Sequence, residues 1–153
     1  PAWPAVADAC EPRAGDFTIP YIAAHHAYAF ARAGRQEALG KTRESTARLL
    51  RETRGNRETA WRRVGTALVE GAIAFGSGDM KRAARTLGPA IDEVGRGGGS
   101  DAQIDLFRQT HLVATGRSGE RSLALDLWKH RVGDRKPTLL EEFWRAELSE
   151  DSP

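Results

Sequence analysis

The residues that first suggest chemistry are the glycines and polar residues of GRGGGSDAQIDLF at positions 95–107. A glycine-rich loop before a helix can hold a phosphate, because its backbone N–H groups converge at the helix N-terminus. A P-loop also needs a preceding strand and a Gly-Lys-Ser/Thr sequence, and a dinucleotide loop needs a strand–turn–helix setting. Neither accompanies this stretch, and Asp101 and Asp105 bring negative charge to the same helix start. The segment therefore predicts a turn between two helices.

Ser100 and Gln103 give this turn a structural role. Their spacing is that of a capping box, in which the serine hydroxyl accepts from the amide three residues on and the glutamine side chain accepts from the serine N–H. Asp101 adds favourable negative charge to the first turn of the helix. We interpret Ser100 and Gln103 as a helix cap.

The four histidines do not have the spacing of a metal site. His25 and His26 are adjacent and point about 100° apart on a helix, so they do not form a ligand pair. His111 and His130 lie on the two helices of one predicted hairpin, without a carboxylate or cysteine at a recognised ligand spacing. The spacing shows no Ser-His-Asp or Cys-His grouping either. We predict no catalytic residue, no metal and no cofactor.

The remaining carboxylates and tryptophans have structural interpretations. Glu141 and Glu142 are expected on a solvated face or at a helix start. Trp61, Trp128 and Trp144 fall on apolar stripes and are expected in the core.

Charge and cysteine usage narrow the classes of partner and compartment. The chain of 153 residues has 23 Lys+Arg and 21 Asp+Glu, a formal charge of +2, and the two signs are interspersed. A nucleic-acid surface clusters its basic residues, so we expect no nucleic-acid partner. No stretch approaches the roughly 20 apolar residues of a membrane span, so no membrane association is expected. Cys10, the only cysteine, fits a reducing, cytoplasmic location.

Apolar residues recur at spacings of three and four along most of the chain, which predicts an all-α fold. Glycines and prolines divide it into about seven helices. Pro89 falls inside the fourth helix and should kink it or remove a hydrogen bond. The predicted helices are 20–33, 37–53, 58–75, 79–94, 101–116, 119–132 and 138–148.

The short connections predict antiparallel hairpins stacked as a tetratricopeptide-like solenoid. Gly34, Gly78 and Gly119 stand between the helices of successive hairpins, 44 and then 41 residues apart. Gly71 occupies a slot where two helices pack closely. The predicted organisation is an irregular or short-helix N-terminal segment at 1–18, a helical repeat domain at 19–148 and a disordered tail at 149–153.

Several stretches resemble one family of helical-repeat proteins. GGSDAQIDLF at 98–107 resembles the GGS-x-AQ-x-D-x-F signature of the tetratricopeptide repeat protein 38 family. AHHAYAFARAG at 24–34, ALVEGAIAFGSGDMKRAARTLGPAI at 67–91 and LLEEFWRAEL at 139–148 are similar to successive helical parts of that family. The resemblance implies that this chain is the C-terminal portion of a longer family member.

Stacked helical hairpins typically bind peptides or proteins, so the sequence predicts a protein-interaction module with a protein or peptide partner. We expect His25, Gln103, Asp105 and Arg108 to contribute a polar patch near the binding surface. The alternative for Asp105 and Arg108 is an ion pair within one helix. The alternative function is an enzyme or small-molecule-binding domain that uses a cluster of His25, Gln103 and Asp105.

The N-terminal end of the array raises the question of self-association. Where upstream repeats are absent, the first hairpin exposes an apolar face that a neighbouring repeat would cover. We therefore predict a homo-oligomer formed through that end.

Overall fold

The chain folds into helices and connecting turns, which confirms the predicted all-α class. The computed structural model describes residues 2–149, and no strand occurs among them. The helices are α1 (Trp3–Cys10), α2 (Pro20–Ala33), α3 (Gln36–Glu52), α4 (Asn56–Ala60), α5 (Thr66–Gly76), α6 (Met80–Leu87), α7 (Asp101–Arg117), α8 (Arg121–Val132) and α9 (Leu139–Ser149). Within the described range, no helix is long and apolar enough to cross a membrane.

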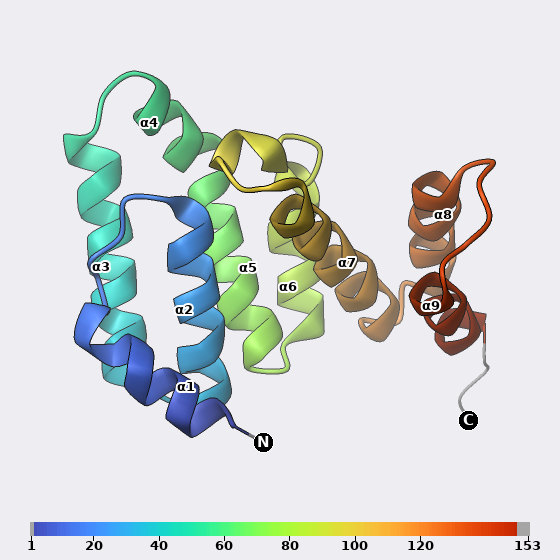
Figure 1. Cartoon of the computed structure of the whole chain (residues 1–153), viewed down its shortest axis with the longest axis horizontal. Helices are drawn as coiled ribbons and strands as arrows, with labels where there is room; N and C mark the ends of the chain where they lie inside the picture. The colour runs from blue at the N-terminus through green and yellow to red at the C-terminus, as the bar shows by residue number, and fades with distance from the viewer. Residues whose placement is uncertain (1, 150–153) are drawn as a thin grey trace.

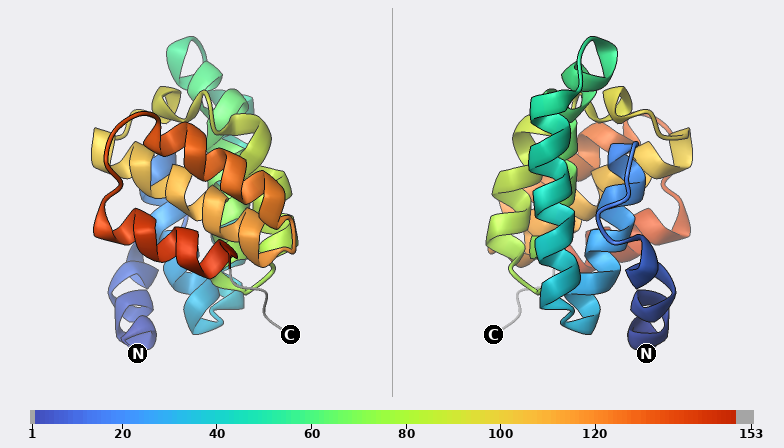
Figure 2. Two further views of the ribbon diagram at one scale, coloured as in Figure 1. Left: turned by 90° about the vertical axis from the view of Figure 1, so that its right-hand side faces the viewer. Right: turned by 90° about the vertical axis from the view of Figure 1, so that its left-hand side faces the viewer.

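Successive helices form hairpins that follow one another along the long axis of the molecule, α2 with α3, α5 with α6 and α7 with α8 (Figure 1). Each hairpin turns at one of the predicted glycines. Gly34, Gly78 and Gly119 have φ of 70°, 84° and 94°, a left-handed conformation that side-chain-bearing residues rarely adopt. In end view, α7, α8 and α9 lie at one end of the array and α1 and α3 at the other (Figure 2).

The main core lies where α2 packs against α5. Tyr21, Phe30, Trp61 and Leu68 are each at most 1% exposed. A Cβ at Gly71 would lie 2.5 Å from the Leu87 side chain, so the predicted close approach of α5 and α6 is confirmed. Such close packing of α5 against α6 requires small residues where the two helices meet.

The segment 56–76 runs as one helical stretch, because α4 and α5 are joined by a π-helical turn over Trp61–Gly65. Gly65 leaves room for the Trp61 ring, since a Cβ there would lie 2.6 Å from it. The π turn accommodates one wider turn without ending the helix.

The predicted helix over 79–94 was wrong in its second half. α6 ends at Leu87, and Pro89 lies in a short 3-10 turn over Gly88–Ala90. Proline has no N–H to donate and its ring clashes with the carbonyl four residues earlier, so the helix ends here instead of bending. The ten residues after Ala90 cross to the start of α7 with one more 3-10 turn, Val94–Gly97.

The glycines of this crossing segment wrap the ring of Tyr21. A Cβ at Gly97 would lie 2.7 Å from the ring, and one at Gly99 would lie 2.8 Å from it. The Tyr21 hydroxyl donates to the Val94 carbonyl at 3.0 Å. The glycine run is therefore a turn shaped by packing, as the sequence predicted, and Ser100 and Gln103 form the predicted capping box.

The N-terminal segment is part of the same fold. α1 packs on α2, and Ala7 and Phe17 are buried in the main core. At the other end, Ser149 belongs to α9 rather than to a tail. The rest of the predicted tail, 150–153, lies outside the described residues.

The expected apolar face of the first hairpin is absent from α3, although Ile19 and Ile22 at the start of α2 are 41% and 43% exposed. α3 turns Ala38 and Leu39 inward, whereas Glu37, Lys41 and Arg48 on its outer side are exposed. The outer side of α3 is therefore polar.

A cluster of exposed apolar side chains occurs at the opposite end, on α9. Leu139 is 86% exposed, Leu140 47% and Phe143 57%.

Candidate functional site

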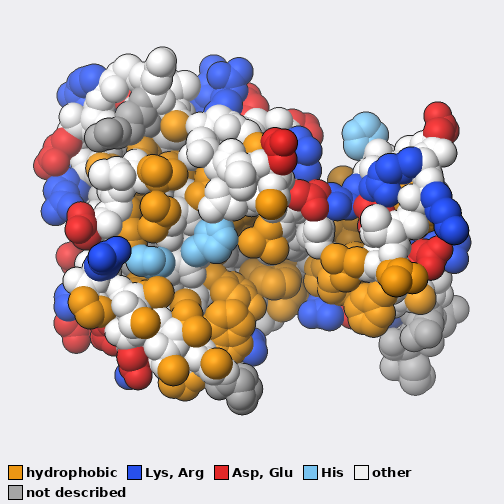
Figure 3. Space-filling view, in the orientation of Figure 1, with side chains coloured by type: hydrophobic (Ala, Val, Ile, Leu, Met, Phe, Trp, Pro, Cys, Tyr) orange, Lys and Arg blue, Asp and Glu red, His pale blue; other side chains and the backbone are white. Residues whose placement is uncertain are grey.

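Two of the cavities beside α7 together hold most of the polar residues that the sequence singles out. The first, here called the inner groove, lies between α2, α5 and α7, the first helices of the successive hairpins. Its volume is about 180 Å³, and it is lined by Ala24, His25, Tyr28, Ala72, Phe75, Leu106, Phe107 and Thr110. Figure 3 shows hydrophobic side chains gathered between α2 and α7, with histidine side chains beside them.

Aromatic rings form the walls of the inner groove. Tyr28 stacks on Phe75 with ring centroids 6.1 Å apart, and His25 meets the edge of Phe107 at 6.0 Å. The His25 Nδ1 lies 2.6 Å from the Tyr21 carbonyl oxygen, which fixes the ring orientation. Ala24 and Ala72 leave the floor open because their side chains are short. The groove is a mainly apolar slot with His25 at its rim.

The second cavity, here called the α7–α8 cavity, lies between α7, α8 and the segment after α6. Its volume is about 400 Å³, and ionisable side chains make up most of its lining. It is lined by Ile91, Asp92, Asp105, Arg108, His111, Leu112, Leu127, His130, Arg131 and Arg135.

The two cavities lie on opposite sides of α7. Successive residues of a helix point about 100° apart, so Leu106 and Thr110 share one side while Asp105 and Arg108 face the other. The four residues of the predicted polar patch are thus divided. Asp105 and Arg108 line the α7–α8 cavity, His25 lines the inner groove, and Gln103 caps α7 without lining either cavity.

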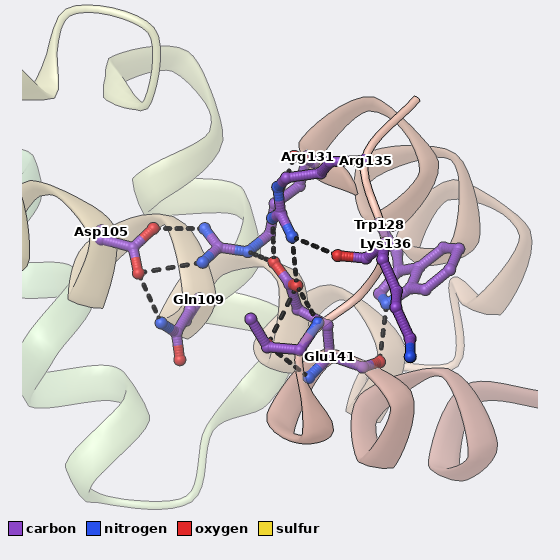
Figure 4. Close-up of polar contacts among 8 residues, drawn as sticks. Asp105, Gln109, Trp128, Arg131, Arg135, Lys136 and Glu141 are labelled. Carbon is purple, nitrogen blue, oxygen red and sulfur yellow. Dashed lines mark hydrogen bonds and ion pairs between the residues drawn. The ribbon is translucent and has the colours of Figure 1, made fainter. Parts of the chain in front are cut away.

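A network of ion pairs ties α7, α8 and α9 together beside the α7–α8 cavity (Figure 4). Arg131 of α8 binds both carboxylate oxygens of Asp105, with Nη2 donating to Oδ2 at 2.9 Å. Its Nε donates to Glu141 of α9, also at 2.9 Å. Arg135 donates to the other oxygen of Glu141 at 2.8 Å, and Gln109 donates to Asp105 at 2.7 Å.

Both carboxylates of this network are held ionised by their partners. The hydrogen bond from Arg131 lowers the pKa of Asp105, and burial only partly opposes it. Arg135, assisted by the Thr138 amide and hydroxyl, holds the pKa of Glu141 far below the ordinary carboxyl range. Each negative charge is therefore matched inside the protein, and the network is structural.

One interpretation of the charged residues is wrong and one is confirmed in its second form. The Asp105–Arg108 ion pair is wrong, because Asp105 turns to Arg131 and Arg108 stays exposed without an ion-pair partner in the described chain. Glu141 is at a helix start, as expected, where its side chain accepts from the Thr138 N–H at 2.9 Å. It is not solvated, being 2% exposed.

The three tryptophans expected in the core are buried to different degrees. Trp61 is fully buried, whereas Trp128 and Trp144 are half-buried. The Trp128 Nε1 donates to the Glu141 carbonyl at 2.7 Å, which adds a second bond between α8 and α9.

His111 is the residue of the α7–α8 cavity whose role the sequence did not reveal. It is 8% exposed, and burial lowers the pKa of its imidazole, an effect that Asp92 partly offsets. A Cβ at Gly88 would lie 3.2 Å from its Nε2, so the glycine beside Pro89 makes room for the ring. The sequence signals for this cavity were the placement of His111 and His130 on one hairpin and the polar residues Asp105 and Arg108.

The described residues contain no group of three or more His, Cys, Asp or Glu side chains that could hold a metal ion. Cys10 is a free, half-buried thiol at the end of α1.

Comparison with models of protein families, with characterised proteins and with solved structures gave no match to this chain.

Proposed function

We propose that this chain is a protein-interaction module that binds a peptide segment of a partner protein in the inner groove. The observation that carries the proposal is the groove itself, an apolar slot formed jointly by α2, α5 and α7. Equivalent helices of consecutive hairpins line one continuous surface in helical-repeat arrays, and such surfaces bind extended segments of partners.

The size of the groove supports a peptide anchor over a small molecule. Small-molecule sites typically enclose about 300–1,000 Å³. The inner groove has about 180 Å³, which suits one large apolar side chain inserted from a partner. Its aromatic walls, Tyr28, Phe75 and Phe107, favour an aromatic or branched aliphatic anchor.

The enzyme alternative has less support. It requires His25, Gln103 and Asp105 to converge on one reacting group, and α7 separates His25 from Asp105. Asp105 is also neutralised by Arg131, so it is not free to act as a base.

The proposal also includes the family relationship and the compartment. The hairpin turns at Gly34, Gly78 and Gly119 support membership of a tetratricopeptide-type family, and the capped glycine turn supports the resemblance to the tetratricopeptide repeat protein 38 family. The free Cys10 favours a cytoplasmic location.

Selection of peptides from a random phage-displayed library tests the function directly. We expect selected peptides to share one Leu, Phe or Trp at a fixed position. Leu106→Ser, which removes an exposed wall of the groove, should weaken their binding about ten-fold by loss of apolar contact.

Leu123→Ser is the matched control, because Leu123 is 49% exposed on α8 and Leu106 is 46% exposed on α7. Its affinity for the selected peptides should be unchanged. Peptides without an apolar consensus, or equal binding by Leu106→Ser and the original chain, would contradict the proposal.

A further inference from the structure

We propose that the α7–α8 cavity is a second binding site, independent of the inner groove, that takes a small organic carboxylate with an apolar body. The cavity of about 400 Å³ lies within the range of small-molecule sites. Its walls offer two kinds of surface, an unpaired cation with hydrogen-bonding groups and a set of aliphatic side chains.

His111 is the first observation that points to a ligand. It is more than nine-tenths buried and lines the cavity, yet its ring forms no hydrogen bond to any described residue. Its ring nitrogens are open to the cavity, because they are not among the fully buried side-chain atoms without a partner, so a ligand can reach them. Since burial keeps this imidazole neutral, one ring nitrogen carries an N–H that can donate to a ligand oxygen.

Arg108 is the second observation. Unlike Arg131 and Arg135, whose guanidinium groups are engaged by Asp105 and Glu141, it has no ion-pair partner among the described residues. A guanidinium matches the planar geometry of a carboxylate and can bind it through two hydrogen bonds.

The internal ion pairs decide the sign of the ligand charge. Asp105 and Glu141 would repel an anion if they were unpaired, but each is bound by arginine. Asp92 is the one lining carboxylate left without an ion-pair partner in the described part of the chain, and it is exposed at the cavity edge. Among the ionised lining residues, the three arginines Arg108, Arg131 and Arg135 outnumber the two aspartates Asp92 and Asp105, so an anion is favoured over a cation.

The aliphatic residues Ile91, Leu112 and Leu127 offer an apolar surface that the hydrocarbon part of the ligand would contact. They line the same cavity as Arg108 and His111, so a ligand that satisfies the polar groups also covers these side chains. A molecule with a short branched hydrocarbon and one carboxylate fits both requirements.

Titration of the full chain with isovalerate, followed by backbone amide NMR, tests the proposal. We expect saturable shifts at the amides of Arg108, His111 and Leu127, with affinity in the millimolar range of such small ligands. The neutral isovaleramide should bind at least about ten-fold more weakly, because it lacks the charge that Arg108 recognises. The cationic isoamylamine should not compete.

Four substitutions, all at exposed residues, keep the test independent of folding. Arg108→Gln should weaken isovalerate binding about ten-fold, whereas Arg85→Gln, an exposed arginine on α6 away from the cavity lining, should leave it unchanged. Asp92→Asn should strengthen binding, since it removes the one unpaired negative charge. Leu106→Ser, which disrupts the inner groove, should have no effect.

Several outcomes would overturn the carboxylate site. They are equal binding of isovalerate and isovaleramide, preferential binding of isoamylamine, unchanged affinity in Arg108→Gln, and the absence of saturable shifts at about 50 mM isovalerate. None of these results bears on peptide binding in the inner groove, so the two proposals succeed or fail separately.

Discussion

Arg131 on α8 and Asp105 on α7 form a two-point ion pair across the last hairpin, with Nη2 2.9 Å from Oδ2. The same guanidinium donates to Glu141, so one side chain joins three helices. Because α9 packs mainly on α8, these contacts connect the end of the array to its centre. The ion pair therefore belongs to the architecture of the fold.

The first prediction concerns the partner of Asp105. In a double-mutant cycle, Asp105→Asn and Arg131→Met should show a coupling energy of about 1 kcal/mol in the free energy of unfolding, the value of a half-exposed bidentate pair. The cycle of Asp105→Asn with Arg108→Gln should show almost none. Urea unfolding followed by circular dichroism measures both. Equal couplings would mean that Asp105 divides its charge between the two arginines.

The second prediction concerns the glycine turn around Tyr21. Gly99→Ala should lower the free energy of unfolding by about 2 kcal/mol, because the new Cβ would lie 2.8 Å from the Tyr21 ring. Gly95→Ala in the same segment is the control, since its Cβ would meet Ile104 at an ordinary 3.5 Å. Thermal unfolding of the two variants compares them, and similar destabilisation would show that backbone freedom rather than the Tyr21 contact requires glycine.

The third prediction is a loss of stability on acidification in two steps. Burial lowers the pKa of His111 and of His26, so the folded chain binds fewer protons than the unfolded chain as the pH falls below about 6.5. The free energy of unfolding should decrease over that range. Below about 4.5, the Glu141 carboxyl takes up a proton in the unfolded chain while its arginine partners keep it ionised in the folded chain, so stability should fall again.

Urea midpoints measured between about pH 8 and pH 3 follow both steps. His111→Gln should reduce the upper step without removing it, because His26 still contributes. Glu141→Gln should flatten the lower step, whereas Glu142→Gln, on the exposed neighbour, should not. A lower step unchanged in Glu141→Gln would assign it to other carboxylates.

The fourth prediction concerns self-association. The outer side of α3 is polar, and the two most exposed large apolar side chains, Leu139 and Phe143, lie on α9, so we expect association through α9 instead of the first hairpin. The chain should show concentration-dependent sedimentation that Leu139→Ser with Phe143→Ser abolishes. Leu123→Ser is the control. A monomer at all concentrations, or association that persists in the α9 variant, would contradict this expectation.

Local signals in the sequence determined most of the secondary structure. The three-and-four spacing of apolar residues predicted α2, α3, the continuous stretch from α4 to α5, α7, α8 and α9 to within a few residues, because burial of one helix face requires that spacing. Gly34, Gly78 and Gly119 marked the hairpin turns, since each needs a left-handed backbone. Ser100 and Gln103 marked the start of α7 through a cap that involves only neighbouring residues. The one misplaced end, at Leu87, came from treating Pro89 as a kink.

The partners of charged side chains and the positions of the cavities were decided only by the tertiary structure. Asp105 had Arg108 one turn away in sequence, but Arg131, 26 residues further on, offered a bidentate and less exposed site. Glu141 was buried by arginines that the sequence places on another helix and in a loop. His25 lines the inner groove, whereas the 100° step between successive residues of α7 turns Asp105 to the opposite side of that helix, so the two side chains do not meet. Local spacing specifies where a helix begins, ends and turns its apolar face, whereas the partner of a long charged side chain depends on which helix the fold brings beside it.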